Sequence, residues 1–236
     1  MPHKVLFIMT GSDHWTLKDG TRHPTGFWAE EAVAPLEILK DAGVEVTVAT
    51  PGGVRPPVDQ GSLTAERTGS EEAAAHIREV VETAPEFQAP VALSDVRVDD
   101  YDAIFVPGGH GPMEDLAADS DAGKALLAAD KAHDPIAIVC HGPAILLSAA
   151  DADGANAFAG RTITAFTNDE EEQGGLADQA SWLLEDRLTD AGLDVVVGEP
   201  WVPHVQVDGN LLTGQNPASS APLAKVLLER LGKGSG

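Results

Sequence analysis

Short apolar runs alternate with longer amphipathic stretches along most of the chain. Val5–Met9 is a continuous apolar run that ends in Thr-Gly-Ser, which is typical of a buried parallel strand. Phe27–Ala42 carries apolar residues at helical spacing and is followed by Gly43. Val44–Ala49 then alternates as a second strand before a Pro-Gly-Gly turn. Because β-α-β crossovers are right-handed, this opening predicts two parallel strands in one sheet.

The alternation resumes after a less regular stretch, residues 52–99, which is too short to bury a core of its own and is interpreted as an insertion. An acidic loop is expected after Phe166, and residues 232–236 are expected to form a frayed tail. The pattern predicts one domain over residues 1–236, an α/β fold with a doubly wound, mostly parallel, flavodoxin-like sheet flanked by helices. The further expected strands are Ala103–Val106, Ile136–Val139, Thr162–Phe166, Val195–Val197, Val205–Val207 and Leu211–Thr213, and the further helices are Glu71–Thr83, Ala122–Ala132, Pro143–Ala150, Leu176–Ala191 and Pro222–Leu231.

Composition narrows the class of protein. Hydrophobic residues make up 43% of the chain and charged residues 22%, so a large core is feasible. No apolar run approaches the length that crosses a bilayer, and the N-terminal run reads as a strand rather than a signal peptide. A single cysteine forms no internal disulfide, which suits a reducing compartment. We therefore expect a cytoplasmic protein without a membrane partner.

The charge balance is strongly acidic. Thirty-eight acidic residues face 15 basic ones, for a formal net charge of −23. Such a surface repels phosphate backbones, so nucleic acid is not an expected partner. The excess is either an ordinary solvated surface or an adaptation to high salt.

One segment carries the features of a nucleophile elbow. In Pro135-Ile-Ala-Ile-Val-Cys140-His141-Gly142-Pro143, a strand of small and β-branched residues leads to a sharp turn, and a predicted helix follows at once. This layout displays Cys140 at the carboxyl end of the sheet, next to a helix start that is expected to favour the thiolate. A lone cysteine can also be an inert, buried, small hydrophobic residue. The junction favours a nucleophile.

A second turn supplies candidate donors for a developing oxyanion. Gly108-Gly109-His110-Gly111 follows another predicted strand and therefore emerges at the same sheet edge. The backbone N–H groups of Gly109 and His141 are the two expected donors. The alternative is an ordinary glycine turn.

These motifs together resemble the ThiJ/PfpI superfamily, which shares the class I glutamine amidotransferase-like fold. The resemblance rests on Val-Cys140-His-Gly-Pro, on Pro107-Gly-Gly-His-Gly and on the early segment from Thr25 to Pro35, and it covers nearly the whole chain. The chain length, Asp19-Gly20 and Thr213-Gly-Gln-Asn-Pro are most similar to the branch of glutathione-independent glyoxalase III and heat-shock chaperones.

The resemblance implies a site around Cys140 and His141. The early glutamate of the family, a proton partner of the cysteine, falls on Glu31, with Pro35 four residues later as in the family pattern. In the acidic run after Phe166, the family spacing indicates Glu171 as the acid that orients His141, while Glu170 and Glu172 stay alternatives.

Other readings and further candidate residues stay open. Glu30 and Glu31 can also be read as carboxylates that stabilise the first helical turn. His110 and Trp28 are expected to line the substrate pocket, with Trp15 and Phe27 as further candidates for an apolar wall or as core residues. Asp13, His14 and His23 are candidates for the pocket edge, without the spacing of a compact metal site.

The activity implied by the resemblance is conversion of methylglyoxal to lactate through a cysteine hemithioacetal, or deglycation of early sugar adducts. It needs neither a cofactor nor a metal, and the family forms homodimers. Two other readings use the same residues: a cysteine peptidase or amidase, and a holding chaperone or oxidation sensor in which Cys140 is oxidised.

Overall fold

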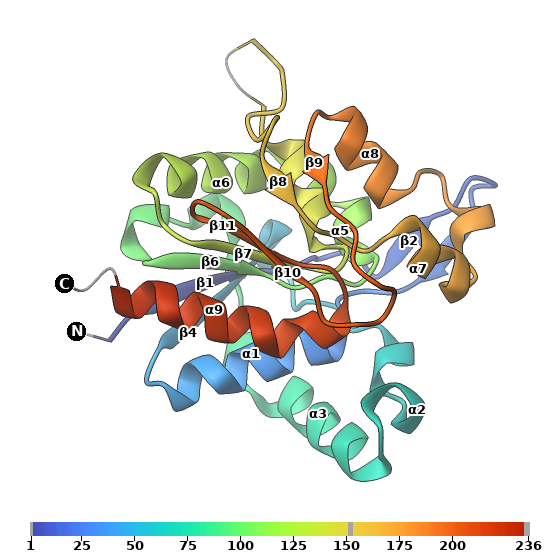
Figure 1. The fold of residues 1–236 in the computed structure, drawn as a ribbon. Helices are drawn as coiled ribbons and strands as arrows, with labels where there is room; N and C mark the ends of the chain where they lie inside the picture. The colour runs from blue at the N-terminus through green and yellow to red at the C-terminus, as the bar shows by residue number, and fades with distance from the viewer. Residues whose placement is uncertain (1, 151–152, 234–236) are drawn as a thin grey trace.

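The computed structural model describes residues 2–150 and 153–233. Within these residues, seven strands form one sheet between two layers of helices (Figure 1). Neighbouring strands are parallel, except that β10 and β11 pair antiparallel at one edge. In sheet order the strands are β10 (Val205–Asp208), β11 (Leu211–Gly214), β7 (Ile136–Val139), β6 (Ala103–Val106), β1 (Lys4–Ile8), β4 (Glu45–Thr50) and β5 (Val91–Ala92). The predicted doubly wound sheet is confirmed.

The central strands are apolar on both faces because helices cover both. All residues of β6 and β7 are buried, which explains why these strands appear in the sequence as continuous apolar runs. In the register of the sheet, Val5 of β1 lies opposite Ala103 of β6 and Val46 of β4. The rings of Phe7 and Phe105 stack at a centroid distance of 4.8 Å in the middle of the core.

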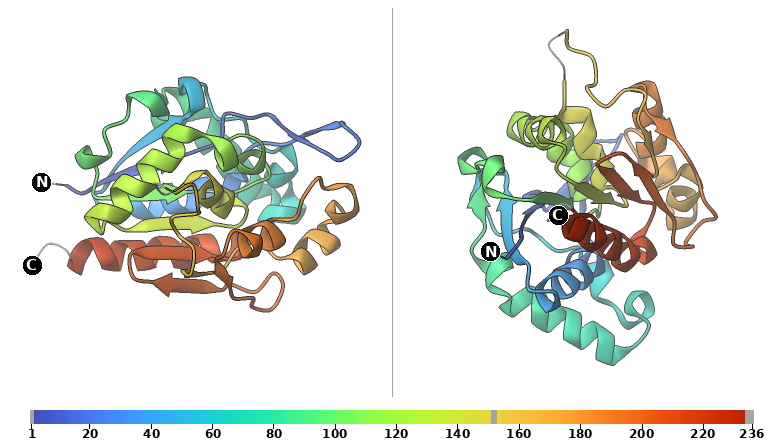
Figure 2. Two further views of the ribbon diagram at one scale, coloured as in Figure 1. Left: turned by 90° about the horizontal axis from the view of Figure 1, so that it is seen from above. Right: turned by 60° about the vertical axis from the view of Figure 1, so that its left-hand side comes forward.

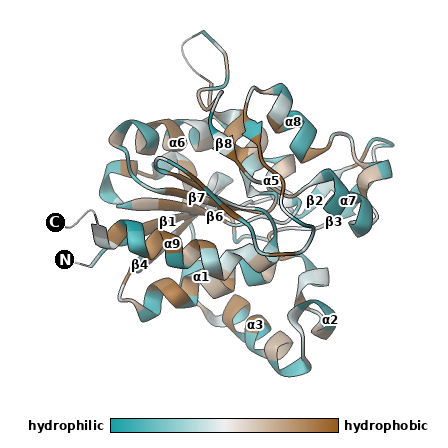
Figure 3. Ribbon diagram, in the orientation of Figure 1, coloured by the Kyte–Doolittle hydropathy of each residue, from teal (hydrophilic) through white to brown (hydrophobic). Residues whose placement is uncertain are grey.

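Two helices cover one face of the sheet, and a more broken layer covers the other (Figure 2). Helices α1 (Ala29–Asp41) and α9 (Ser220–Lys233) pack side by side on the first face, with α3 (Glu71–Thr83) outside α1. The second face carries α6 (Ser120–Ala132) and the 3₁₀ helix η6 (Gly142–Ser148). Apolar positions gather on the strands, and polar ones lie on the outer faces of the helices (Figure 3). No helix in the described ranges is long and apolar enough to span a membrane.

The insertion at residues 52–99 is built onto the sheet. Its strand β5 lies beside β4 at the sheet edge, and its start forms a β-bridge between Val58 and Phe27. It also contains α2 (Ala65–Thr68), α3 and α4 (Pro85–Gln88), together with four 3₁₀ turns, η1 (Pro51–Gly53), η2 (Gln60–Leu63), η3 (Leu93–Asp95) and η4 (Val98–Asp100).

The remaining short elements lie mostly around the carboxyl ends of the strands. A hairpin of β2 and β3 follows β1, and a separate parallel pair of β8 and β9 lies beside β10. Their bounds are β2 (His14–Thr16), β3 (Arg22–Pro24), α5 (Gly111–Glu114), η5 (Leu116–Ala118), β8 (Thr162–Ile163), α7 (Asn168–Gly174), η7 (Ala177–Gln179), α8 (Leu184–Asp190), β9 (Asp194–Val195) and η8 (Pro217–Ser219).

Four local expectations were wrong, three of them in helical or loop segments. The acidic stretch after Phe166 is helix α7 rather than a loop, because Thr167 caps it and a capping box closes its first turn. The expected helix Leu176–Ala191 is divided into η7 and α8 by a non-helical segment that bends at residues 181–182. The helix expected at Pro143–Ala150 is the 3₁₀ helix η6.

The strand expected at Thr162–Phe166 also differs. Only Thr162–Ile163 is a strand, outside the main sheet. The following residues cross the ends of the sheet strands instead, since the Thr164 N–H donates to Thr213 Oγ1 at 2.8 Å.

Candidate active site

Cys140 lies at the end of β7, where the chain turns sharply. Its backbone is left-handed, with φ at 60°, a conformation that costs about 1–3 kcal/mol in a residue other than glycine. Hydrogen bonds hold it from both sides: the Cys140 N–H donates to the Gly214 carbonyl, and the Cys140 carbonyl accepts the Phe166 N–H, each at 2.9 Å. The elbow shape expected from the sequence is present, and η6 follows directly.

The thiol is less acidic than the sequence suggested. Cys140 is only 3% exposed. Burial and the neighbouring Glu31 carboxyl raise the pKa of Cys140, and the N–H of Gly109 offsets this only in part. The seven-residue 3₁₀ helix η6 therefore does not make Cys140 a resting thiolate, and the site needs a base to take its proton.

The glycine turn after β6 locks onto the start of α1. The Trp28 N–H donates to the Gly108 carbonyl, and the Gly111 N–H donates to the Gly26 carbonyl, each at 3.1 Å. A methyl group on Gly109, which has φ at 86°, would come within 2.4 Å of the Gly26 carbonyl. Only glycine fits this contact, which brings the first turn of α1 up to the cysteine elbow.

Glu31 projects from that first turn into the protein interior. It is fully buried, and its Oε2 accepts the Gly108 N–H at 2.7 Å. Its Oε1 is also buried, without a hydrogen-bond partner of ordinary geometry among the described residues. Burial raises the pKa of Glu31 to about 8, although the facing thiol of Cys140 and the Gly108 N–H lower it. At neutral pH this carboxyl is therefore protonated and is a proton donor beside the sulfur.

His141 lies between Cys140 and Glu171. The Cys140 sulfur is 3.3 Å from His141 Nδ1, and His141 Nε2 is 2.7 Å from Glu171 Oε2. Burial and the neighbouring His110 lower the pKa of His141. A neutral ring whose Nε2–H donates to Glu171 presents the lone pair of Nδ1 to the thiol. This is the tautomer that a general base requires.

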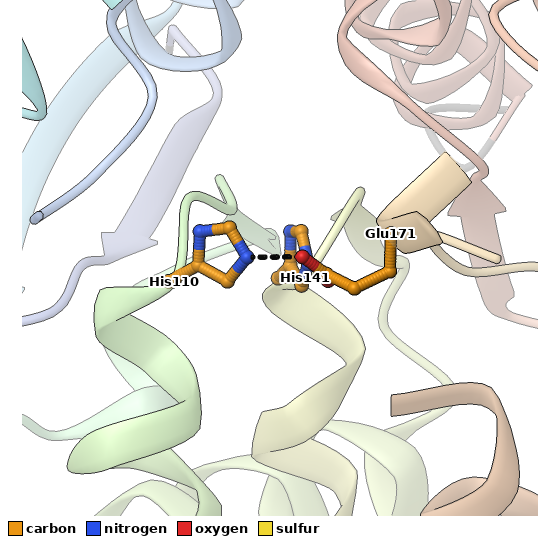
Figure 4. A group of neighbouring side chains, drawn as sticks. All are labelled: His110, His141 and Glu171. Atoms are coloured by element: carbon orange, nitrogen blue, oxygen red, sulfur yellow. Dashed lines mark hydrogen bonds and ion pairs between the residues drawn. The ribbon is translucent and has the colours of Figure 1, made fainter. Parts of the chain in front are cut away.

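The Glu171 carboxylate contacts the imidazole rings of both His141 and His110, which lie beside it in Figure 4. Glu171 Oε1 also accepts from His110 Nε2 at 2.9 Å. Burial alone would raise the pKa of Glu171, but the rings of His141 and His110 hold it well below its ordinary value. The donor atoms of the three residues lie within 4.8 Å of one another, close enough to share a metal ion. In the structure both Nε2 atoms are engaged by the carboxylate instead.

A row of rings in contact, of which Trp15 and His110 are stacked and the others are tilted, holds the two histidines in place. Trp15 stacks on His110 at 4.8 Å, His110 lies 4.1 Å from His141, and His141 lies 4.3 Å from Phe166 between ring centroids. Trp201 meets the edge of Phe166 at 5.5 Å. Since Trp15 and Phe166 are buried, the imidazoles cannot tilt freely away from Glu171.

The three neighbouring acids have separate positions. Glu170 is fully buried, and its carboxylate accepts hydrogen bonds from Thr167, from the Trp201 N–H at 2.8 Å and from Asn216 Nδ2 at 2.9 Å. Glu172 is exposed. Of the alternatives that the sequence left open, only Glu171 contacts His141.

Cys140 and His141 open into a cavity of about 290 Å³. Trp28, Phe166 and Trp201 give it apolar walls. Trp28 and His110 were expected here from the sequence, and both line it. Phe166 and Trp201 were missed, because nothing local in the sequence indicates that their segments reach this edge of the sheet.

Other candidates lie elsewhere. His23 lines the cavity, but His14 contacts Asp13 at 2.9 Å and Glu114 at 3.2 Å on the β2–β3 hairpin. Phe27 is a core residue that packs against Phe87 with 5.8 Å between ring centroids. The insertion contributes Asp59 and Arg67 to the cavity, which its irregular sequence did not indicate.

Comparisons with known proteins show which family and which relatives the chain is similar to. A sequence model of the DJ-1/PfpI family matches residues 24–230. The protein/nucleic acid deglycase HchA of Staphylococcus aureus strain Newman is 29% identical over 234 residues, which cover 97% of this chain and 80% of that protein.

Two solved structures are similar over almost the entire chain. Glyoxalase III from Candida albicans superposes with a TM-score of 0.82 and 26% identity, covering 96% of each chain. The Rapid Encystment Protein 24 KDa of Francisella tularensis gives a TM-score of 0.82 and 28% identity, covering 96% of this chain and 98% of that one.

Proposed function

The chain belongs to the DJ-1/PfpI family, and on that basis and on the geometry of the site we propose that it is a glutathione-independent glyoxalase. It converts methylglyoxal and similar 2-oxoaldehydes to 2-hydroxy acids such as lactate. The reaction adds water and is an internal redox change: the aldehyde carbon C1 is oxidised to the acid, and the ketone carbon C2 is reduced to the alcohol. The reaction needs no external oxidant or reductant.

The first step is formation of a hemithioacetal. His141 Nδ1 takes the proton of the Cys140 thiol, 3.3 Å away, as the sulfur bonds to C1 of the aldehyde. Glu31, protonated at neutral pH, gives its proton to the aldehyde oxygen. The amides of Gly109 and His141 are the donors that stabilise this oxygen while it carries charge.

The second step moves one proton from C1 to C2. The Glu31 carboxylate removes the C1 proton, the C2 oxygen takes the proton held by His141, and an enediol forms. Glu31 then returns the proton to C2, while the C1 hydroxyl loses its proton to His141, which leaves a thioester on Cys140. Water then attacks the thioester and gives one proton to the Glu31 carboxylate, while the departing sulfur takes the proton held by His141. This releases the acid and restores the Cys140 thiol, the protonated Glu31 and the neutral His141.

The observation that carries the proposal is the chain of contacts from the Cys140 sulfur to His141 and from His141 to Glu171, together with the contact of the sulfur with the Glu31 carboxyl. Burial keeps Glu31 protonated and His141 neutral, so a donor and a base flank one nucleophile at the same pH. Such pairs of titratable groups with separated pKa values are typical of acid–base catalysis.

The direct test is methylglyoxal consumption together with lactate formation. We expect Cys140→Ala to reduce turnover at least about a thousandfold, because the covalent route is lost. Asp41→Asn is a suitable control, since it removes one exposed charge from the far end of α1. Lactate formation at the wild-type rate by Cys140→Ala would refute the mechanism.

Deglycation of protein adducts is a second activity that the same thiol can support, and the name of the Staphylococcus aureus relative favours it. That name also includes nucleic acids, but a net charge of −23 repels phosphate backbones, so the proposal is limited to aldehydes and protein adducts. The two activities are separated by adding enzyme to a glycated peptide after free methylglyoxal has been removed. Release of the adduct must then come from deglycation rather than from scavenging.

A further inference from the structure

The cavity above Cys140 is larger than methylglyoxal requires. Its volume is about 290 Å³, and a water-sized group occupies roughly 30 Å³ in a liquid. The five non-hydrogen atoms of methylglyoxal would therefore fill roughly half of it. Since Cys140 is buried while Arg67 and Trp201 are exposed, the remaining space lies between the reacting sulfur and the opening.

The charged side chains around this space differ in how many hydrogen bonds and ion pairs they make. Asp59 accepts hydrogen bonds from Thr25 Oγ1 at 2.7 Å and from the Gly61 N–H at 2.8 Å, and Glu171 is held by two histidines. Arg67 is different: within the described ranges its guanidinium makes no hydrogen bond, ion pair or ring contact.

An unpaired arginine is unusual in so acidic a chain. With 38 acidic residues against 15 basic ones, most arginines find a partner. Over residues 2–150 and 153–233, the other arginine without a contact from its guanidinium is Arg230, which lines a separate cavity at the amino ends of the strands. Arg67 thus places one free positive charge at the opening of the candidate active site.

We infer that the preferred substrate is a 2-oxoaldehyde that carries a carboxylate at its other end. This rests on the proposed function and names the substrate class for the same site. The aldehyde carbon bonds to the Cys140 sulfur, the aliphatic middle lies between Trp28 and Trp201, and the carboxylate meets the Arg67 guanidinium. The chemistry is unchanged: water is added, C1 is oxidised, C2 is reduced, and the product is a 2-hydroxy dicarboxylic acid.

Arginine suits this role. Its planar fork binds a carboxylate through two parallel hydrogen bonds. An anionic tail would otherwise be repelled by the acidic surface, so the local cation decides whether such a substrate is accepted.

The test compares 4,5-dioxopentanoate with its neutral methyl ester, which has the same reacting end. The ratio of kcat/KM for the acid to that for the ester is measured in wild type, Arg67→Met, Arg67→Lys and Arg230→Met, with product identified by mass spectrometry. We expect the ratio to fall about fivefold in Arg67→Met, the upper end for an exposed ion pair. Arg67→Lys keeps part of the preference, and Arg230→Met, which loses the same charge elsewhere, keeps the wild-type ratio.

An equal ratio in wild type and Arg67→Met would overturn the inference while leaving methylglyoxal turnover, and hence the proposed function, intact. If wild type turns over neither methylglyoxal nor the acid or its ester, the proposed function fails, and the inference, which rests on it, fails with it. Quenching of tryptophan fluorescence, with Trp28 and Trp201 in the cavity, gives the Kd of 2-hydroxyglutarate and of lactate in Cys140→Ala. Tighter binding of 2-hydroxyglutarate that is lost with Arg67 supports the inference, and equal Kd values with and without Arg67 refute it.

Discussion

Replacing Glu31 with glutamine should change how the stability of the protein depends on pH. Glutamine keeps the shape of a protonated glutamate, and its amide oxygen can still accept the Gly108 N–H that Glu31 Oε2 accepts at 2.7 Å. What it removes is the ability to ionise. The substitution therefore isolates the cost of placing a carboxylate in this fully buried position.

The magnitude follows from the pKa. Burial raises the pKa of Glu31 from 4.5 to about 8, so between these pH values the folded protein holds a proton that the unfolded chain has lost. The free energy of unfolding of the wild type therefore falls as pH rises through this window. A difference of about 3.5 pKa units corresponds to about 5 kcal/mol, at about 1.4 kcal/mol for each unit. Glu31→Gln escapes this loss and becomes progressively more stable than the wild type.

The assay is urea unfolding at several pH values from 5 to 8.5, with the free energy extrapolated to water. Asp41→Asn is the matched control, because Asp41 is exposed on the same helix. The wild type and this control should lose stability together as pH rises, while the curve of Glu31→Gln stays flatter. Parallel curves for wild type and Glu31→Gln would show that Glu31 is ionised in the folded protein, and its role as a proton donor would then be wrong.

Three further predictions concern the turn, the base and the surface. Gly108→Ala should cost about 1–3 kcal/mol in urea unfolding, because the new methyl group would come within 2.6 Å of the His141 nitrogen and 2.8 Å of Glu31 Oε2. Gly232→Ala, with open space around it in helix α9, should cause no loss of stability, since alanine favours a helix more than glycine does. Glu171→Gln should lower kcat about a hundredfold or more, because Glu171 orients the base His141. Since the pKa of His141 is lowered, the acid limb of the wild-type pH profile of kcat/KM should lie below pH about 6.5. If the net charge of −23 reflects adaptation to high salt, Tm should rise between low and molar salt, and a constant Tm would exclude that explanation.

The sequence predicted the fold well where the local hydrophobic pattern and the tertiary packing favour the same secondary structure. Strand Ile136–Val139 and helix Glu71–Thr83 have the expected bounds, because a buried strand must be apolar throughout and an amphipathic helix must repeat every turn. The turn at residues 108–111 was also predicted from the sequence. Its contacts leave no room for a side chain at Gly109, so the position must be glycine, and glycine marks a turn.

The sequence could not predict contacts between distant segments. The Phe166 N–H donates to the Cys140 carbonyl, which directs this segment across the site instead of along the sheet. Trp201 has φ at 63° and is held by the distant Glu170, so no local rule predicts its place. The acidity of Cys140 was misjudged for the same reason: the buried Glu31 carboxyl comes from another part of the chain.

The sequence contains a local motif that separates the roles of Glu170 and Glu171. Thr167-Asn-Asp-Glu170 is a capping box, in which the fourth residue folds back to the N–H of the first. Glu170 Oε2 accepts the Thr167 N–H at 3.0 Å, so this side chain is committed to the start of α7. Successive residues on a helix point about 100° apart, so Glu171 must project in another direction, which here is toward His141. The cap thus sets the register of α7, and the register determines which carboxylate orients the base.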